Sequence, residues 1–220
     1  MPFGPSSGRT GISFPPGSSG RWRENLQPGG RTELPELQNR IDGRWRVDMD
    51  LGIREASPPD AKCISDLIRK VFMDSLAHQF TPDGGRVFLS FIEPGNLSGL
   101  LGGHLFGYVA EVSGEVVGVI LFKDPALISL FFVSGLYRGR GVGTALLGEG
   151  ILSLKRRDPR LPRIRVNSVP SAVGTYERLG FRTAGKERVV EGIRFIPMEM
   201  DEKGMFRYLR APVRSSPPPP

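Results

Sequence analysis

The sequence predicts a mixed α/β fold, in which helices pack on a β-sheet. Short apolar runs rich in β-branched and aromatic residues, typical of strands, recur from residue 51 onward. Segments with apolar residues at helical spacing lie between several of these runs. A glycine-rich loop, residues 138–143, separates one such strand from one such helix. The expected order is β-α-α-β-β-β-α-β-α-β-β, which favours a mixed sheet covered by helices.

The globular pattern begins with a strand and a helix. Gly52–Ala56 alternates as strands do, and Ser57–Asp60 predicts a helix start, because Ser and Asp cap helices and Pro suits the first turn. Apolar residues follow a helical period over Ala61–Phe72, and a second helix is expected over Pro82–Ile92. Residues 93–103 are expected to form a loop or a short turn of helix.

The remaining elements follow from the same patterns. Ser113-Gly114 is a two-residue hairpin signal between two alternating runs, and a second hairpin closes the pattern. The predicted strands are Leu105–Val112, Val116–Phe122, Leu127–Val133, Ile164–Asn167, Phe181–Glu187 and Ile193–Met200, and the predicted helices are Val142–Leu154 and Ser171–Leu179.

Composition divides the chain into three parts. Residues 1–46 are dominated by Gly, Pro, Ser and Arg and have no apolar period, so we expect a disordered extension. Residues 47–201 form the predicted globular domain, and residues 202–220 form a basic tail that ends in four prolines. Translation from Met49 is an open alternative, so the sequence does not decide whether residues 1–48 belong to the native protein.

The net charge of +7 does not by itself indicate a nucleic-acid-binding domain. The two terminal segments carry +3 each and the middle carries +1. A nucleic-acid-binding domain usually has a basic face of its own, so we expect no specific nucleic-acid partner. The alternative is binding driven by the tails, which would be weak and sensitive to salt.

The sequence also argues against a membrane span, a secretory signal and a metal site. No apolar stretch reaches the roughly 18–20 residues of a transmembrane helix, and the N-terminus lacks the apolar core of a signal peptide. The single cysteine, Cys63, allows no internal disulfide, and His78 and His104 have no ligand spacing around them. We therefore expect a cytoplasmic protein without a bound metal.

The glycine loop has the physical features of a phosphate site. The N–H groups at a helix start have no intrahelical partners, the helix dipole adds positive potential, and glycine allows close approach. A dinucleotide fingerprint is excluded, because Thr144 stands where its third glycine would be and the next strand ends in Asn167, not an acid. No Gly-Lys-Ser/Thr follows, which excludes a Walker loop. A tight glycine turn without a ligand is the structural alternative.

The motif Arg138-x-x-Gly141-x-Gly143, behind the strand that ends at Val133, resembles the acetyl-CoA signature of the GNAT N-acetyltransferases. Later segments resemble the same family in order and spacing. They are Val166-Asn167-Ser168, Tyr176, Arg178-Leu179-Gly180-Phe181 and Phe195-Ile196-Pro197-Met198. The resemblance covers about residues 51–201. It implies a splayed central β-sheet with helices on both faces and a cleft between two strands.

The resemblance also implies how acetyl-CoA would bind. The pantetheine arm would lie along one strand and the diphosphate on the glycine loop, with two further contacts from the second half of the domain. The implied binding residues are Phe131, Phe132, Val133, Arg138, Gly139, Arg140, Gly141, Val142, Gly143, Thr144, Asn167 and Tyr176. Arg140 is equally compatible with a solvated side chain, and Asn167 with a simple cap after its strand.

The implied reaction is direct attack of a primary amine, of a small molecule or a protein, on the acetyl thioester in a ternary complex. The backbone N–H of Val133 would stabilise the oxyanion, and Tyr176 would donate a proton to the leaving thiolate. Packing alone is the alternative role for Tyr176. Ala126–Leu130 contains neither acid nor histidine, so we expect a water chain as the base.

Three acids lie nearby in the chain, Glu93, Glu111 and Asp124. We expect each of them to be a solvated surface residue and not the general base. The segment His78–Gly84 is expected to border the acceptor pocket. A non-catalytic acyl-CoA-binding module of the same fold remains the alternative function. The sequence names neither the acceptor nor the acyl group, and it leaves a homodimer open.

Overall fold

The computed structural model of the 220-residue chain describes residues 40–41, 44–45, 50–123 and 125–209. Most of the extension for which disorder is predicted, and the end of the tail, lie outside these residues. Within the extension, β1 (Arg40–Ile41) and β2 (Arg44–Trp45) pair antiparallel. No described helix is both long enough and apolar enough to cross a membrane.

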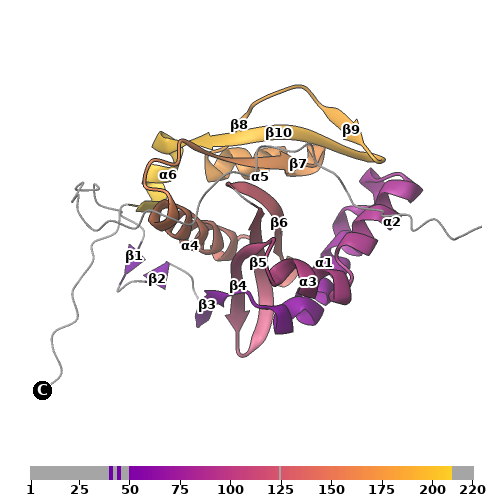
Figure 1. Ribbon diagram of the computed structural model, residues 1–220, viewed down its shortest axis with the longest axis horizontal. Coiled ribbons are helices and arrows are strands. Elements are labelled where there is room, and N and C mark those ends of the chain that lie inside the picture. Colours follow the sequence, from indigo (N-terminus) through magenta and orange to yellow (C-terminus); the bar gives the residue numbers. More distant parts are fainter. Residues whose placement is uncertain (1–39, 42–43, 46–49, 124, 210–220) are drawn as a thin grey trace, which may run out of the picture. The chain divides into compact units, whose positions relative to one another are not determined.

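A mixed sheet forms the centre of the domain, as predicted (Figure 1). Its strand order is β3-β4-β5-β6-β7-β10-β8, and β9 also pairs with β10. Neighbours are antiparallel except β6 and β7, which are parallel. The strands are β3 (Leu51–Glu55), β4 (Phe106–Val112), β5 (Glu115–Lys123), β6 (Leu127–Val133), β7 (Arg163–Ser168), β8 (Arg182–Thr183), β9 (Arg188–Val190) and β10 (Ile193–Asp201).

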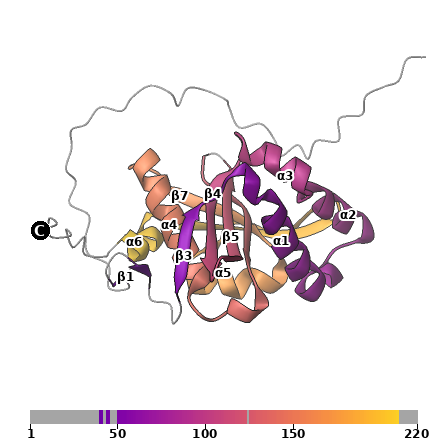
Figure 2. The same ribbon diagram turned by 90° about the horizontal axis from the view of Figure 1, so that it is seen from below.

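Helices cover both faces of the sheet, again as predicted (Figure 2). One face packs against α1 (Ala61–Ser75), α2 (Pro82–Phe91) and α3 (Pro94–Leu101). The other packs against α4 (Val142–Arg157), α5 (Val173–Leu179) and α6 (Glu202–Leu209). Short 3₁₀ turns are η1 (Pro58–Asp60), η2 (Ala77–Gln79), η3 (Gly135–Tyr137) and η4 (Pro170–Ala172).

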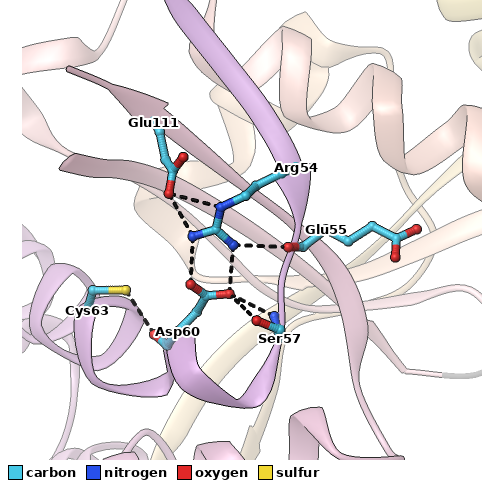
Figure 3. Close-up of polar contacts among 6 residues, drawn as sticks. All are labelled: Arg54, Glu55, Ser57, Asp60, Cys63 and Glu111. Atoms are coloured by element: carbon cyan, nitrogen blue, oxygen red, sulfur yellow. Dashed lines mark hydrogen bonds and ion pairs between the residues drawn. The ribbon is translucent and has the colours of Figure 1, made fainter. Parts of the chain in front are cut away.

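A polar network fixes the start of α1 against the sheet (Figure 3). The Arg54 guanidinium donates to both carboxylate oxygens of Asp60, at 2.8 and 2.7 Å, and to Glu111 on β4 at 2.6 Å. Asp60 also accepts from the backbone N–H and hydroxyl of Ser57, both at 2.8 Å. The hydrogen bonds from Arg54 lower the pKa of Asp60 to about 2. The carboxylate is therefore charged and paired at neutral pH.

The structure differs from the sequence prediction in two helices. Residues 94–101 form the regular helix α3, although a loop or a short turn was expected there, because Leu97 and Leu101 are buried in the core. The predicted tail begins with α6, whose Met205 and Tyr208 side chains are buried at 0% and 3% exposure. Burial of a few apolar side chains thus stabilises both segments, including α3, whose Gly, Asn and Ser residues do not favour a helix.

The terminal hairpin also differs, because its first strand is interrupted. β8 pairs with Met198 and Glu199, whereas β9 pairs with residues 193–195 in another register. Pro197 lies between the two pairings and has no N–H to donate to a neighbouring strand. Its carbonyl still accepts the N–H of Ala184 at 2.8 Å. Of the predicted strand 181–187, only Arg182–Thr183 forms a strand, and β9 begins at Arg188, after the predicted end.

Candidate active site

Strands β6 and β7 are joined only at the beginning of β6. Their parallel pairing covers Leu127 with Arg165 and Ile128 with Val166. The register between β5 and β6 then shifts at Ser129, so this residue forms a bulge. A bulge bends its strand and increases its twist. After Ser129 the two strands diverge and leave a gap in the middle of the sheet, which agrees with the implied splay.

The backbone groups of Phe131 and Val133 face this gap. The N–H of Ser134 donates to Val117 on β5 at 2.8 Å. Hydrogen-bonding direction alternates along an antiparallel pair, so Phe132 also points its backbone toward β5. Phe131 and Val133 point theirs to the opposite side, where β7 has diverged. Of the three residues expected to pair with pantetheine, these two have the required backbone orientation.

The N-terminus of α4 lies beside the same strand. Gly141 caps the helix with φ 86°, and the first helical hydrogen bond runs from Ala145 to Gly141 at 2.9 Å. The N–H groups of residues 142–144 therefore have no acceptor within the helix. A Cβ placed on Gly143 would lie 3.5 Å from the ring of Phe131. The start of α4 therefore lies next to the part of β6 that borders the gap.

The two arginines of the loop take different positions. Arg138 folds back, and its guanidinium donates to the carbonyl of Val133 at 3.4 Å and to the hydroxyl of Ser75 at 3.5 Å. Arg140 is exposed and lies 6.0 Å from the centre of the Tyr137 ring. Gly139 has φ 74°, which allows the loop to turn between them. Arg138 therefore connects the loop to the end of α1.

Tyr176 lies against β6 on the α4 face. Its ring centre is 6.2 Å from that of Phe131 and 5.4 Å from that of Phe181. Burial raises the pKa of its phenol well above the usual value, so the hydroxyl keeps its proton. The hydroxyl makes no hydrogen bond to another residue within the described part of the chain. A protonated hydroxyl without such a partner is suited to donate to a ligand.

Asn167 is exposed on β7, where it pairs with Pro197 of β10. Its neighbours Val166 and Ser168 are buried toward α4 and α5, so its side chain lies on the opposite face of the sheet. It begins neither η4 nor α5. The structure therefore separates Asn167 from Tyr176 by the thickness of the sheet.

No free acid lies on β6. Glu111 is paired with Arg54, and Glu93 is paired with Arg69 at 2.6 Å. Asp124 lies outside the described residues. Among the described residues, no cluster of three His, Cys, Asp or Glu side chains could hold a metal ion. The thiol of Cys63 donates to the carbonyl of Asp60 at 3.0 Å, and burial raises its pKa, which argues against a nucleophile.

Residues 77–81, here called the crossing segment, connect the two sides of the gap. They follow α1, but the side chain of Gln79 accepts the N–H of Ser171 after β7 at 3.4 Å. The N–H of Thr81 donates to Gly192 at 3.4 Å, at the turn before β10. Figure 1 shows α2, which follows this segment, beside the β9–β10 hairpin. The Nε2 atom of Gln79 is buried without a hydrogen-bond partner in the described residues.

Sequence reasoning did not identify Ser75 or Ser129 as part of the site, and it included Gln79 only within the segment His78–Gly84 expected to border the acceptor pocket. Ser129 had a detectable signal, because it is the one polar residue inside the apolar run 127–133. Ile128 and Leu130 lie two positions apart yet face opposite sides of the sheet, which only a bulge allows. Ser75 and Gln79 act through contacts with distant segments and have no local signal.

The part of the chain that forms this site also resembles known proteins. A family model described as an acetyltransferase (GNAT) domain matches residues 76–202, more than half of the chain. The chain belongs to the GNAT acetyltransferase family. An uncharacterised N-acetyltransferase of Methanocaldococcus jannaschii is 33% identical over 96 residues, which are 39% of this chain. The match spans 41% of the length of that relative.

Solved structures of GNAT proteins share the fold. A GCN5-related N-acetyltransferase from Rhodopseudomonas palustris superposes with a TM-score of 0.61 and 18% identity, over 72% of this chain and 99% of that one. The PaiA N-acetyltransferase from Thermoplasma acidophilum, solved in complex with coenzyme A, superposes with a TM-score of 0.58 and 17% identity, over 70% and 99% of the chains. At these identities the likeness concerns the fold alone.

Proposed function

We propose that this GNAT protein transfers an acetyl group from acetyl-CoA to a primary amine by direct attack in a ternary complex. The observation that carries the proposal is the gap after Ser129, where β6 turns the backbones of Phe131 and Val133 away from β5. The gap leads to the free N–H groups at the start of α4. A pantetheine arm and a diphosphate need these two features in this order.

The proposed chemistry assigns a role to each group. The amine nitrogen attacks the thioester carbonyl carbon, and the N–H of Val133, or that of Phe131 on the same side, donates to the oxyanion. The C–S bond breaks, and the hydroxyl of Tyr176 donates its proton to the leaving thiolate. A water chain carries the amine proton away and returns a proton to Tyr176, since the acids Glu93 and Glu111 are paired with Arg69 and Arg54.

The diphosphate would lie on the N–H groups of residues 139–144, with positive charge from Arg138 and Arg140. Arg138 would have to leave the carbonyl of Val133 for pantetheine to pair there, and the 3.4 Å contact is long enough to be weak. Asn167 would contact the ligand only from the other face of the sheet. A cytoplasmic location and a homodimer remain predictions.

A non-catalytic acyl-CoA-binding module is the second candidate, favoured by the lack of an acid or a histidine on β6. Calorimetric titration with acetyl-CoA, followed by measurement of released CoA thiol with a panel of amines, separates the two. We expect binding and amine-dependent thiol release. Binding without release for any amine would favour the module, and no binding would contradict both.

A further inference from the structure

Four aromatic rings connect the crossing segment to the edge of the gap. Phe80, at the end of η2, lies 5.0 Å from Phe72 of α1 and 5.7 Å from Phe88 of α2, between ring centres. Phe88 lies 6.1 Å from Phe132 on β6. Phe72 is buried, whereas the other three rings are half-buried. These rings form an apolar surface on the α1–α3 face.

Phe80 occupies a special position in this group. Both of its chain neighbours are tied to the far side of the gap, Gln79 to Ser171 and Thr81 to Gly192. Its own ring packs on α1 and α2, on the near side. Phe80 therefore lies where the chain crosses between the two halves of the sheet.

Phe132 places the same surface next to the reacting atoms of the proposed function. It lies between Phe131 and Val133, whose backbones face the gap. The start of α4 and Tyr176 are on the opposite face of the sheet. The α1–α3 face is thus the side from which an acceptor can reach the thioester without meeting the CoA diphosphate.

The ring surface contains no carboxylate. Asp83, at the start of α2, is paired with Arg86, and Glu93 is paired with Arg69. Asp74 on α1 and Glu191 on the β9–β10 turn are exposed side chains. An amine with several positive charges would need several acids along its length, which these rings do not provide.

We propose, on the basis of the proposed function, that the acceptor is a primary amine carried on an aromatic or branched apolar body. The body packs on Phe80, Phe88 and Phe132, and the amine extends past Phe132 to the thioester. Aromatic pairs add to the apolar area that such an acceptor buries. Polyamines and aminoglycosides lack an apolar body of this kind.

The test compares kcat/KM for phenethylamine, tryptamine and isoamylamine with that for putrescine, spermidine and kanamycin, using acetyl-CoA and the full chain. We expect the first group to exceed the second by at least about tenfold, since burial of an apolar group of this size contributes roughly 1.5–3 kcal/mol. Phe80→Ala should lower kcat/KM for phenethylamine about ten- to a hundredfold, mainly through KM. The affinity for acetyl-CoA should not change.

Met73→Ala is the matched control, because Met73 is 62% exposed on α1. This substitution should leave kcat/KM for the amines and the affinity for acetyl-CoA unchanged. Phe80→Leu retains apolar volume without the ring, so an intermediate loss is expected even if the alanine variant folds poorly. Preferred use of putrescine or kanamycin would overturn this inference and leave the proposed function intact. If acetyl-CoA binds but no amine releases CoA, both fail.

Discussion

The two halves of the sheet differ in how completely they are covered. In the N-terminal half, β3–β6, residues 119–122 have 0% exposure, because helices pack on both faces. In the C-terminal half, β7–β10, all of β9 is exposed and Val189 is 62% exposed. Apolar burial is the dominant stabilising term in folding, so the N-terminal half contributes more to the stability of the domain than the C-terminal half.

The proposed site lies where these halves meet. Only two residue pairs join β6 to β7, and the crossing segment adds three hydrogen bonds of 3.3–3.4 Å on the other side of the gap. Because few backbone pairs join these strands, a ligand can be added between them as an extra strand. The comparison therefore predicts that changes in the N-terminal half affect stability, and that changes at the join affect activity.

The largest expected effect on activity is at the join. Tyr176→Phe removes the hydroxyl and keeps the ring packing on Phe131 and Phe181. We expect turnover to fall about ten- to a thousandfold, the range in which acid catalysis contributes. Acetyl-CoA affinity by calorimetry should remain within about twofold. Tyr108→Phe, on β4, is the control, and unchanged turnover in the Tyr176 variant would remove this residue from the mechanism.

The next effect is on stability in the N-terminal half. Asp60→Asn removes the charge that Arg54 pairs with, and should lower the free energy of unfolding by about 1–3 kcal/mol at pH 7. Because the pKa of Asp60 is lowered to about 2, its contribution is present above pH ~4 and is lost as the pH falls toward 2.

Urea unfolding at pH 7 and near pH 3 measures this difference. The difference in the free energy of unfolding between wild type and the Asp60 variant should become smaller at the lower pH. Asp66→Asn is the control, because its pair with Lys62 is exposed to solvent and should contribute little to stability. If the Asp60→Asn variant is as stable as wild type at pH 7, the network in Figure 3 does not stabilise the start of α1.

A somewhat smaller effect is expected at the loop. Gly141→Ala places a Cβ at φ 86°, which costs about 1–2 kcal/mol and shifts the start of α4. Acetyl-CoA should bind about five- to thirtyfold more weakly. Gly99→Ala, in open space on α3, should bind acetyl-CoA as wild type does. Equal affinities in the two variants would argue against a diphosphate at this helix start.

The smallest expected effect is at the contact between α2 and the hairpin. A Cβ on Gly84 would lie 2.5 Å from the carbonyl oxygen of Gly192, so Gly84→Ala must displace one of the two. We expect KM for the acceptor amine to rise about three- to tenfold, with unfolding little changed. Gly85→Ala meets only the ring of Phe72 at 3.8 Å and is the control. A loss of global stability instead would place this contact in the core.

The parts of the site that local chemistry encodes could be predicted from the sequence. Gly139 and Gly141 have the positive φ values that a glycine loop before a helix suggests. The apolar run 127–133 was correctly predicted as a strand, and the mixed sheet with helices on both faces was confirmed. These features depend on backbone preference and on periodicity within a few residues.

The rest depends on contacts between distant segments. The bulge at Ser129 is defined by its register against β5, and the crossing segment by its contacts with Ser171 and Gly192. α3 and α6 form because Leu97 and Met205 reach core positions that no local pattern specifies. Tertiary packing therefore determined the elements that sequence reasoning missed.

Binding of acetyl-CoA in the gap between β6 and β7 is tested by hydrogen exchange of the full chain, measured by mass spectrometry with and without saturating acetyl-CoA. We expect slower exchange in peptides covering residues 129–133 and 138–145, and unchanged exchange in β4 and β5. Protection confined to another region, such as the groove beside Gly180, Arg182 and Arg207, would contradict it.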